Sequence, residues 1–305
     1  MRYALATPEI ADLEEVVLTE TSTAQLFDLE AHRPARLLAP MVQRHIETVA
    51  ALLAGTRRDH LRRRLAATGG ASLALAGWLA FDEGAPVAAA EYLDSAAAAA
   101  RYASDGPLLA CVLTYQSYLA EEAGDLHGAW HLAHQALSHV GAIARARAWV
   151  ALRSAQLAAS VREQGLALAD MEMAVKLAAA LPPVAADTEA PVWARFFDRC
   201  VVFTMAASVH VRLGDQRAAR ESINSVLRTL SGERIKTRAI GLAETALVAA
   251  YTGDVDLLCE CAPKAAELAR FLECTLAQRT LRALPPLLAP LQGNSAVRAL
   301  AELFG

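Results

Sequence analysis

The feature that most constrains this chain is a recurring helical hairpin with a glycine at its turn. The clearest copy is LTYQSYLAEEAGDLHGAWHLAHQAL (113–137), in which two apolar helices flank Gly124 and Asp125. Glycine suits the left-handed backbone that ends a helix, and aspartate caps the next helix by accepting from its free N–H groups. The pattern returns at spacings of 40, 41, 49 and 39 residues, with the other turns predicted at Gly84, Gly165, Gly214 and Gly253. This near-constant period predicts an all-α solenoid of stacked antiparallel helical hairpins.

Composition supports an all-α chain. Hydrophobic residues make up 55% of the sequence but aromatic residues only 6%, and much of the apolar share is alanine, the best helix former. The net charge of −4 argues against a general affinity for nucleic acid, which needs a strongly positive face. The basic stretch RRDHLRRRL (57–65) is short and lacks interleaved aromatic residues, so we interpret it as a solvated helix face.

Cysteine usage and hydropathy point to a cytoplasmic protein. The first fifteen residues turn acidic before an apolar core forms, so no signal peptide is expected. The longest apolar run, 66–81, is shorter than the roughly 20 residues that cross a bilayer, so no membrane association is expected. No CxxC pair occurs, and we expect reduced, buried thiols at Cys111, Cys200, Cys259, Cys261 and Cys274.

Three regions are predicted along the chain. Residues 1–56 supply N-terminal helices that cap the array, and they begin with a short hairpin over 8–19 and 24–31. Residues 57–273 hold the tetratricopeptide-like repeats. Residues 274–305 form C-terminal capping helices, because a terminal repeat must cover the last apolar face of the array.

An inserted loop at 181–192 interrupts the repeats and explains the 49-residue spacing. The stretch 181–198 holds three of the twelve prolines, and the chain is expected to re-enter a helix through Trp193, Phe196 and Phe197. A long loop in a regular array is usually either disordered or functional, and the aromatic residues beside this one suggest that it is anchored.

No signature of catalysis or of a cofactor is found. His127, His131 and His134 share one helix face at a spacing that could hold a metal ion, but no acid of that helix joins them and HExxH is missing. Exposed histidines on an outer face are the commoner explanation. No P-loop, GxSxG or dinucleotide glycine pattern occurs either. We therefore assign no catalytic residue, no metal and no cofactor, although a cavity of convergent side chains would be invisible to motifs.

The hairpins resemble the tetratricopeptide repeat. Gly77 falls where that repeat makes a close helix contact, and Ala89 and Ala96 fall at its small second-helix positions. The corresponding positions around Gly124 and Gly214 hold Ser117, Ala129, Ala136, Ala207, Ala219 and Val226. The chain departs from the repeat in lacking the proline after the second helix, and its period is nearer 40 than the family's roughly 34 residues.

The chain is also similar to the C-terminal sensor region of actinobacterial XRE-type helix-turn-helix transcriptional regulators. The stretches that carry this resemblance are LRRRLAATGGASLALAGWLAFDEG, the hairpin from Tyr118 to Ala136, and a P-x-W-x-x-[FY] entry at Pro191, Trp193 and Phe196. Those regulators carry an N-terminal DNA-binding domain, and residues 1–60 show no such pattern. The resemblance implies either a fragment or a stand-alone relative, and a regulatory, sensing role without direct binding of nucleic acid by this chain.

In solenoids of this kind the first helix of each hairpin lines the concave face. Carrying those positions over predicts a groove formed by Trp78, Asp82, Thr114, Tyr118, Glu122, Arg162, Ser208, Arg212 and Tyr251. Trp193 and Phe197 of the inserted region are expected to fold over it. Aromatic walls with a few charges suit a small molecule or a peptide. Trp78 and Tyr118 could equally be packing residues between helices.

The leading hypothesis is a non-enzymatic protein that senses a small molecule or peptide and is linked to transcriptional regulation. A second hypothesis is a protein-interaction scaffold or homodimer, which predicts a large partner interface. A third is a biosynthetic-pathway enzyme built on a sensor-like helical fold, which predicts a deep closed cavity.

Overall fold

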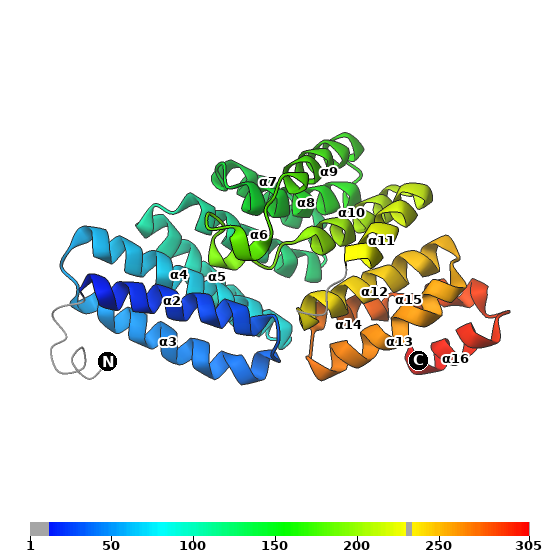
Figure 1. Cartoon of the computed structure of the whole chain (residues 1–305), viewed down its shortest axis with the longest axis horizontal. Helices are drawn as coiled ribbons and strands as arrows, with labels where there is room; N and C mark the ends of the chain where they lie inside the picture. Colours follow the sequence, from blue (N-terminus) through cyan, green and yellow to red (C-terminus); the bar gives the residue numbers. More distant parts are fainter. Residues whose placement is uncertain (1–11, 230–233, 305) are drawn as a thin grey trace. The chain divides into compact units, whose positions relative to one another are not determined.

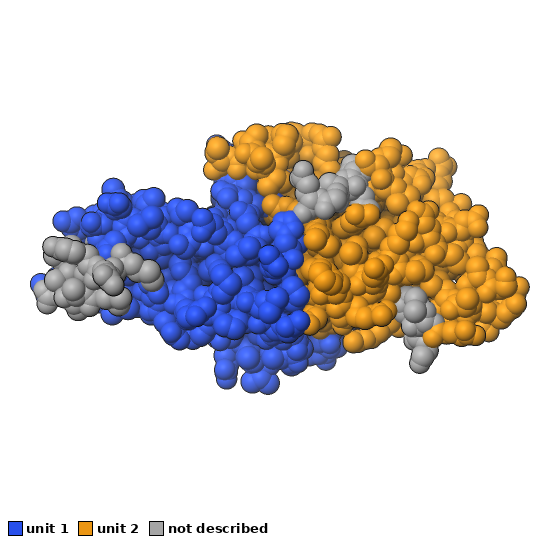
Figure 2. Space-filling model, turned by 60° about the horizontal axis from the view of Figure 1, so that its bottom comes forward, with its two compact units in different colours: residues 1–150, 189–195 blue, residues 151–188, 196–305 orange. Residues whose placement is uncertain are grey.

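The computed structural model describes residues 12–229 and 234–304, and within those ranges it contains helices and no strands (Figure 1). The predicted all-α, tetratricopeptide-like fold of antiparallel helical hairpins is confirmed. The chain divides into two compact units (Figure 2). The first unit comprises residues 1–150 and 189–195, and the second comprises residues 151–188 and 196–305. The three-region division of the sequence stays a prediction.

The first unit is built from helical hairpins packed side by side. The pairs are α2 (Leu13–Glu30) with α3 (Ala35–Gly55), α4 (Asp59–Asp82) with α5 (Pro86–Ala103), and α6 (Gly106–Glu122) with α7 (Leu126–His139). Helix α4 packs against α2, α3, α5 and α6, so it forms the core of the unit (Figure 1). The unit also takes in the start of α8 (Ala144–Ser160).

Small residues allow the paired helices to approach closely. A Cβ atom added to Gly77 would lie 2.7 Å from Cγ of Leu93 on α5 and 3.2 Å from the carbonyl oxygen of Ala89. Ala89 itself is fully buried. The predicted close contact at Gly77 is therefore confirmed. The other small positions of the repeat are all buried too, at Ala96, Ser117, Ala129, Ala136, Ala207, Ala219 and Val226.

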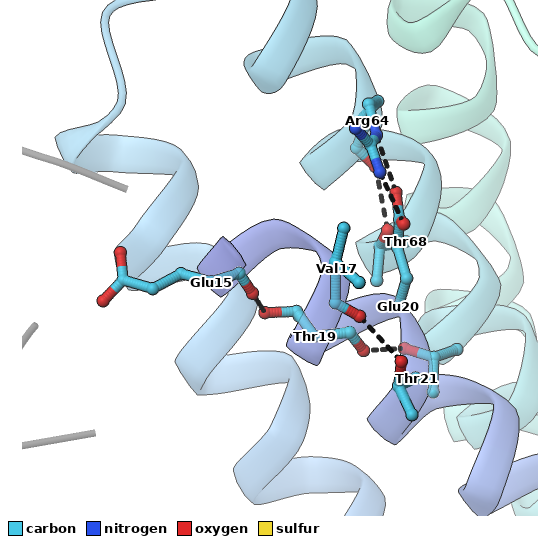
Figure 3. A network of polar contacts seen from close by, with 8 residues as sticks. Glu15, Val17, Thr19, Glu20, Thr21, Arg64 and Thr68 are labelled. Atoms are coloured by element: carbon cyan, nitrogen blue, oxygen red, sulfur yellow. Dashed lines mark hydrogen bonds and ion pairs between the residues drawn. The ribbon is translucent and has the colours of Figure 1, made fainter. Parts of the chain in front are cut away.

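Helix α2 differs from the sequence prediction, which placed a turn between 8–19 and 24–31. The described part of that stretch is one continuous helix, and residues 8–11 lie outside the described residues. The polar run after Leu18 fits within the helix because its hydroxyl groups are satisfied there: Thr19 and Thr23 are buried, and Thr19 donates to the carbonyl oxygen of Glu15 at 2.6 Å (Figure 3). Glu20 of this run also accepts two hydrogen bonds from Arg64 of α4, at 2.7 and 2.9 Å, which ties α2 to the core helix (Figure 3).

The second unit continues the hairpin pattern and ends in shorter helices. Its elements are the end of α8, α9 (Gln164–Ala179), α10 (Arg199–Leu213), α11 (Gln216–Thr229), α12 (Ile235–Thr252), α13 (Val255–Phe271), α14 (Thr275–Arg282), α15 (Leu284–Leu288) and α16 (Ser295–Phe304). Helix α10 packs against α9, α11 and α12, and α12 packs against α13. Helix α14 covers α12 and α13, and α16 covers α13. The C-terminal helices thus bury apolar side chains of the last hairpin, as at Leu281, Leu288 and Val297.

The turns confirm the glycine pattern except in the third hairpin. Gly84, Gly124, Gly214 and Gly253 adopt φ angles between +72° and +82°, which is left-handed backbone that glycine adopts without steric cost. Gly165 was predicted as the third turn, and this is wrong. Arg162 adopts the left-handed conformation instead, with φ +66°, and Gly165 lies inside the first turn of α9.

The cysteines and the apolar helix fit a compact helical protein. All five cysteines are free thiols, buried except for the half-buried Cys259. Among the described residues, α4 alone is long and apolar enough to cross a membrane by length and composition, and most of it is buried inside the protein.

Candidate functional site

A series of aromatic rings in contact with one another lies in the first unit. Trp78 and Phe81 are one helical turn apart on α4, and Tyr115 and Tyr118 are one turn apart on α6. Because α4 and α6 pack together, the two pairs meet. The ring centroid of Trp78 lies 5.3 Å from Phe81, 4.9 Å from Tyr115 and 5.5 Å from Tyr118. Such aromatic pairs contribute about 0.5–1.5 kcal/mol each beyond the area they bury.

The series continues from Tyr115 into the inserted region. Trp149 of α8 lies 5.6 Å from Tyr115. Trp193 of the short 3-10 helix η2 (Val192–Ala194) lies 6.0 Å from Trp149. We call Trp78, Phe81, Tyr115, Tyr118, Trp149 and Trp193 the ring cluster. Trp149 and Trp193 are 1% and 4% exposed, whereas Trp78 and Tyr118 are half-buried, so the cluster reaches the surface at its Trp78 end.

Polar groups in and beside the ring cluster are partly or fully buried. The indole N–H of Trp78 donates to Oε1 of Glu30, the last residue of α2, at 3.3 Å. Burial raises the pKa of the Tyr115 phenol well above its ordinary value, and the negative charge of Glu30 acts in the same direction. Burial likewise raises the pKa of the Cys111 thiol, which hydrogen-bonds with Tyr115. Both groups therefore remain neutral near pH 7 and act as fixed dipoles in an apolar surrounding.

The remaining predicted site residues of the first unit have different surroundings. Asp82 is the last residue of α4 and is buried, whereas Glu122, the last residue of α6, is exposed. Thr114 is fully buried, and its hydroxyl donates to the carbonyl oxygen of Ala110 at 2.7 Å. Thr114 is therefore a buried core residue of the first unit. Trp78 and Tyr118 are two predicted site residues whose side chains the structure brings into contact.

In the second unit one predicted residue, Arg212, is hydrogen-bonded to two residues of α8. Nη1 of Arg212, near the end of α10, donates to the carbonyl oxygen of Gln156 at 3.0 Å and to Oγ of Ser160 at 2.7 Å. Ser208, one turn earlier on α10, is buried. The hydroxyl of Tyr251 on α12 lies 4.0 Å from where a Cβ atom of Gly214 would stand. This end of α10 thus combines a guanidinium group with hydroxyl groups.

Arg162 and Phe197 are the remaining predicted site residues of the second unit. Arg162 is exposed and forms the turn between α8 and α9. Phe197 is 0% exposed and packs edge-on against Phe196, directly before α10. The two phenylalanines precede the helix instead of starting it, because Asp198 caps α10 by accepting from the N–H of Val201 at 3.0 Å.

Sequence reasoning missed Gln156 and Ser160. Trp78 and Asp82 lie six and two residues before the turn residue Gly84, and the matching positions before Gly214 hold Ser208 and Arg212. With the third turn assigned to Gly165, these positions fall three residues too late, on Ala159 and Glu163. Counted from the observed turn at Arg162, they are Gln156 and Ser160, and both hydrogen-bond with Arg212.

No cluster of three metal-ligating side chains is placed to hold an ion within the parts of the chain that the structure describes. His131 and His134 are exposed and lie beside the Trp130 ring, at centroid distances of 4.9 and 5.7 Å.

The comparisons with known proteins reveal the fold. No protein-family model matches the sequence, and no curated protein matches it either. Among solved structures, the chain is similar to a Rap protein in complex with competence and sporulation factor. The TM-score is 0.59 at 14% sequence identity, and the match covers 94% of this chain and 85% of the Rap chain. At this identity, the similarity shows a shared helical-repeat fold.

Proposed function

We propose that this protein is a non-enzymatic sensor that binds a small molecule or a short peptide at the half-buried end of the ring cluster. The carrying observation is the contact between Trp78 and Tyr118, two aromatic side chains from neighbouring hairpins that are both partly exposed. Rigid aromatic surface beside a carboxylate binds ligands at low entropic cost, because few side-chain torsions must be fixed.

The fold comparison supports a binding role. The Rap protein with this fold was solved in complex with competence and sporulation factor, so at least one chain of similar architecture binds a separate factor. The sequence resemblance to the sensor region of XRE-type regulators supports a link to transcriptional regulation, exerted through a partner and not through DNA contacts of this chain. In this proposal, Arg212, Ser208 and Tyr251 form a second polar contact region within the second unit.

A peptide and metabolite screen tests this function. Native mass spectrometry of the purified chain would reveal a retained small molecule, and a thermal-shift screen would identify short peptides that raise the melting temperature. For any ligand found, Tyr118→Ala should weaken binding by roughly tenfold or more, since a partly buried aromatic anchor is lost.

The control is Lys264→Ala, an exposed side chain of α13 in the second unit that the proposal assigns to no contact region, and it should leave affinity at the ring cluster within about twofold. Equal binding by wild type and Tyr118→Ala would contradict the proposed location. A screen in which no compound shifts the melting temperature would contradict the sensing function.

A further inference from the structure

The path of the chain between the units carries one further inference. Residues 189–195 belong to the first unit, although the residues on both sides, up to Thr188 and from Phe196, belong to the second. We call residues 189–195 the strap. The chain therefore leaves the second unit, places one short segment on the first and returns.

The strap is held by side-chain burial more than by regular structure. Trp193, Ala190 and Ala194 are each 4% exposed or less. The helical part is one 3-10 turn, in which the N–H of Ala194 donates to the carbonyl oxygen of Pro191 at 2.9 Å. A segment without a longer helix depends on its buried side chains, and it opens locally at a lower free-energy cost when one of them is removed.

Two contact routes connect Trp193 to the proposed binding residue Trp78. One runs through the rings of Trp149 and Tyr115, with successive centroid distances of 6.0, 5.6 and 4.9 Å. The other runs along α2, which packs against η2 and whose last residue, Glu30, accepts the indole N–H of Trp78. Close-packed rings cannot shift independently, because each fills the space beside the next.

We infer that the strap is a regulatory element that responds to occupancy of the ring cluster: a ligand that shifts Trp78 changes the packing of Tyr115 and Trp149 and so changes how firmly Trp193 is seated. This inference rests on the proposed function for the identity of the trigger. The coupling itself is a property of the ligand-free chain. Ligand binding thereby alters how firmly the strap is held within the first unit, which provides an output without any contact between ligand and strap.

Amide hydrogen exchange of the full-length, ligand-free protein tests the coupling. Trp193→Ala should speed exchange at the amides of Ala194 and Arg195 by roughly tenfold or more, because the buried anchor of the strap is removed. Trp78→Phe, at the other end of the ring cluster, should speed exchange at the same amides by several-fold. Trp130→Phe is the matched control, since its ring neighbours are His131 and His134 and not the ring cluster.

Unchanged strap exchange in Trp78→Phe, with faster exchange in Trp193→Ala, would overturn the coupling. Unchanged exchange in Trp193→Ala would overturn the anchoring. If α4 itself loses protection in Trp78→Phe, Glu30→Ala tests the same connection through α2, because it removes the acceptor of the indole N–H, and an unchanged strap would again overturn it. These measurements use no ligand, so a failed ligand screen and a failed coupling are separate results.

Discussion

Equivalent positions in the two units carry opposite chemistry. Six residues before the turn, the first unit has Trp78 and Tyr118, whereas the second unit has Gln156 and Ser208. The same repeat geometry therefore brings two rings into edge-to-face contact in the first unit. In the second unit, the positions two residues before the turn hold Ser160 and Arg212, and these two side chains hydrogen-bond to each other at 2.7 Å. The difference shows that the repeat fixes where a side chain lies and leaves open whether packing or hydrogen bonding is used there.

The two kinds of contact should differ in energy. Burying an aromatic ring contributes several kcal/mol, whereas a hydrogen bond that exchanges with water contributes about 0.5–1.5 kcal/mol net. The first unit's site should therefore be rigid and preorganised. The second unit's polar group should rearrange more easily.

The largest effect is expected for Trp149→Ala, in the middle of the ring cluster. Trp149 is 1% exposed and contacts both Tyr115 and Trp193. Removing it should lower the free energy of unfolding by about 3–5 kcal/mol, because a large cavity opens in a close-packed core. Urea denaturation followed by circular dichroism measures this. Trp130→Ala should cost clearly less, and equal losses would show that the ring cluster has no special role in the first unit.

The turn assignments give a pair of changes with opposite sign. Gly124→Ala places a side chain at φ +82° and should destabilise by about 1–2 kcal/mol. Gly165→Ala should stabilise by about 0.5–1 kcal/mol, because Gly165 is helical and an added Cβ atom would meet nothing within 4 Å. Melting temperatures of the two variants decide the matter. If Gly165→Ala proves less stable than the wild type, the turn would instead be assigned to Gly165, as the sequence predicted.

A smaller effect is expected for Arg212→Ala in the second unit. The variant loses the hydrogen bonds to Gln156 and Ser160, and the expected cost is about 0.5–1 kcal/mol since the guanidinium group is largely solvated. Arg212→Lys retains the charge but not the two-partner geometry, so it should recover only part of the loss in urea denaturation. A cost near that of Trp149→Ala would contradict the proposed contrast between the units.

The smallest expected effect is a dependence of folding stability on pH, which arises from one histidine in each unit, His45 and His210. Burial lowers the pKa of His45, which hydrogen-bonds with Thr23, and of His210, where Asp215 and Glu221 oppose the shift. Both folded-state values lie below the ordinary 6.5, so the unfolded chain binds protons first as the pH falls. Stability should be full above about pH 6.5 and decline below it.

Melting curves between about pH 7.5 and 5.5 check this dependence, since they span about one unit on each side of the ordinary histidine pKa. His45→Gln should flatten the curve more than His210→Gln, because neighbouring acids oppose the shift of His210. A stability that rises on acidification through this range would contradict the assignment.

The sequence alone predicted the hairpins, most of their turns and the small contact positions, because these follow from helical period and residue volume. Gly77 against Leu93 is such a case. The sequence prediction failed at the third turn because Arg162 adopts the left-handed backbone conformation that glycine usually adopts. It also failed at α2, where the buried threonines of a polar run satisfy their hydroxyl groups within the helix. The joining of Trp193 to Trp149 depends on tertiary packing of an irregular segment, and no local periodicity encodes that.

The ring cluster also gives this protein a built-in spectroscopic reporter. Three of the four tryptophans are members of it, and Trp149 and Trp193 are close enough for their transitions to couple as an exciton pair. The near-ultraviolet dichroism of the native chain should therefore be intense and sensitive to small rotations of either indole. Any event that reorients these rings would be visible without a label.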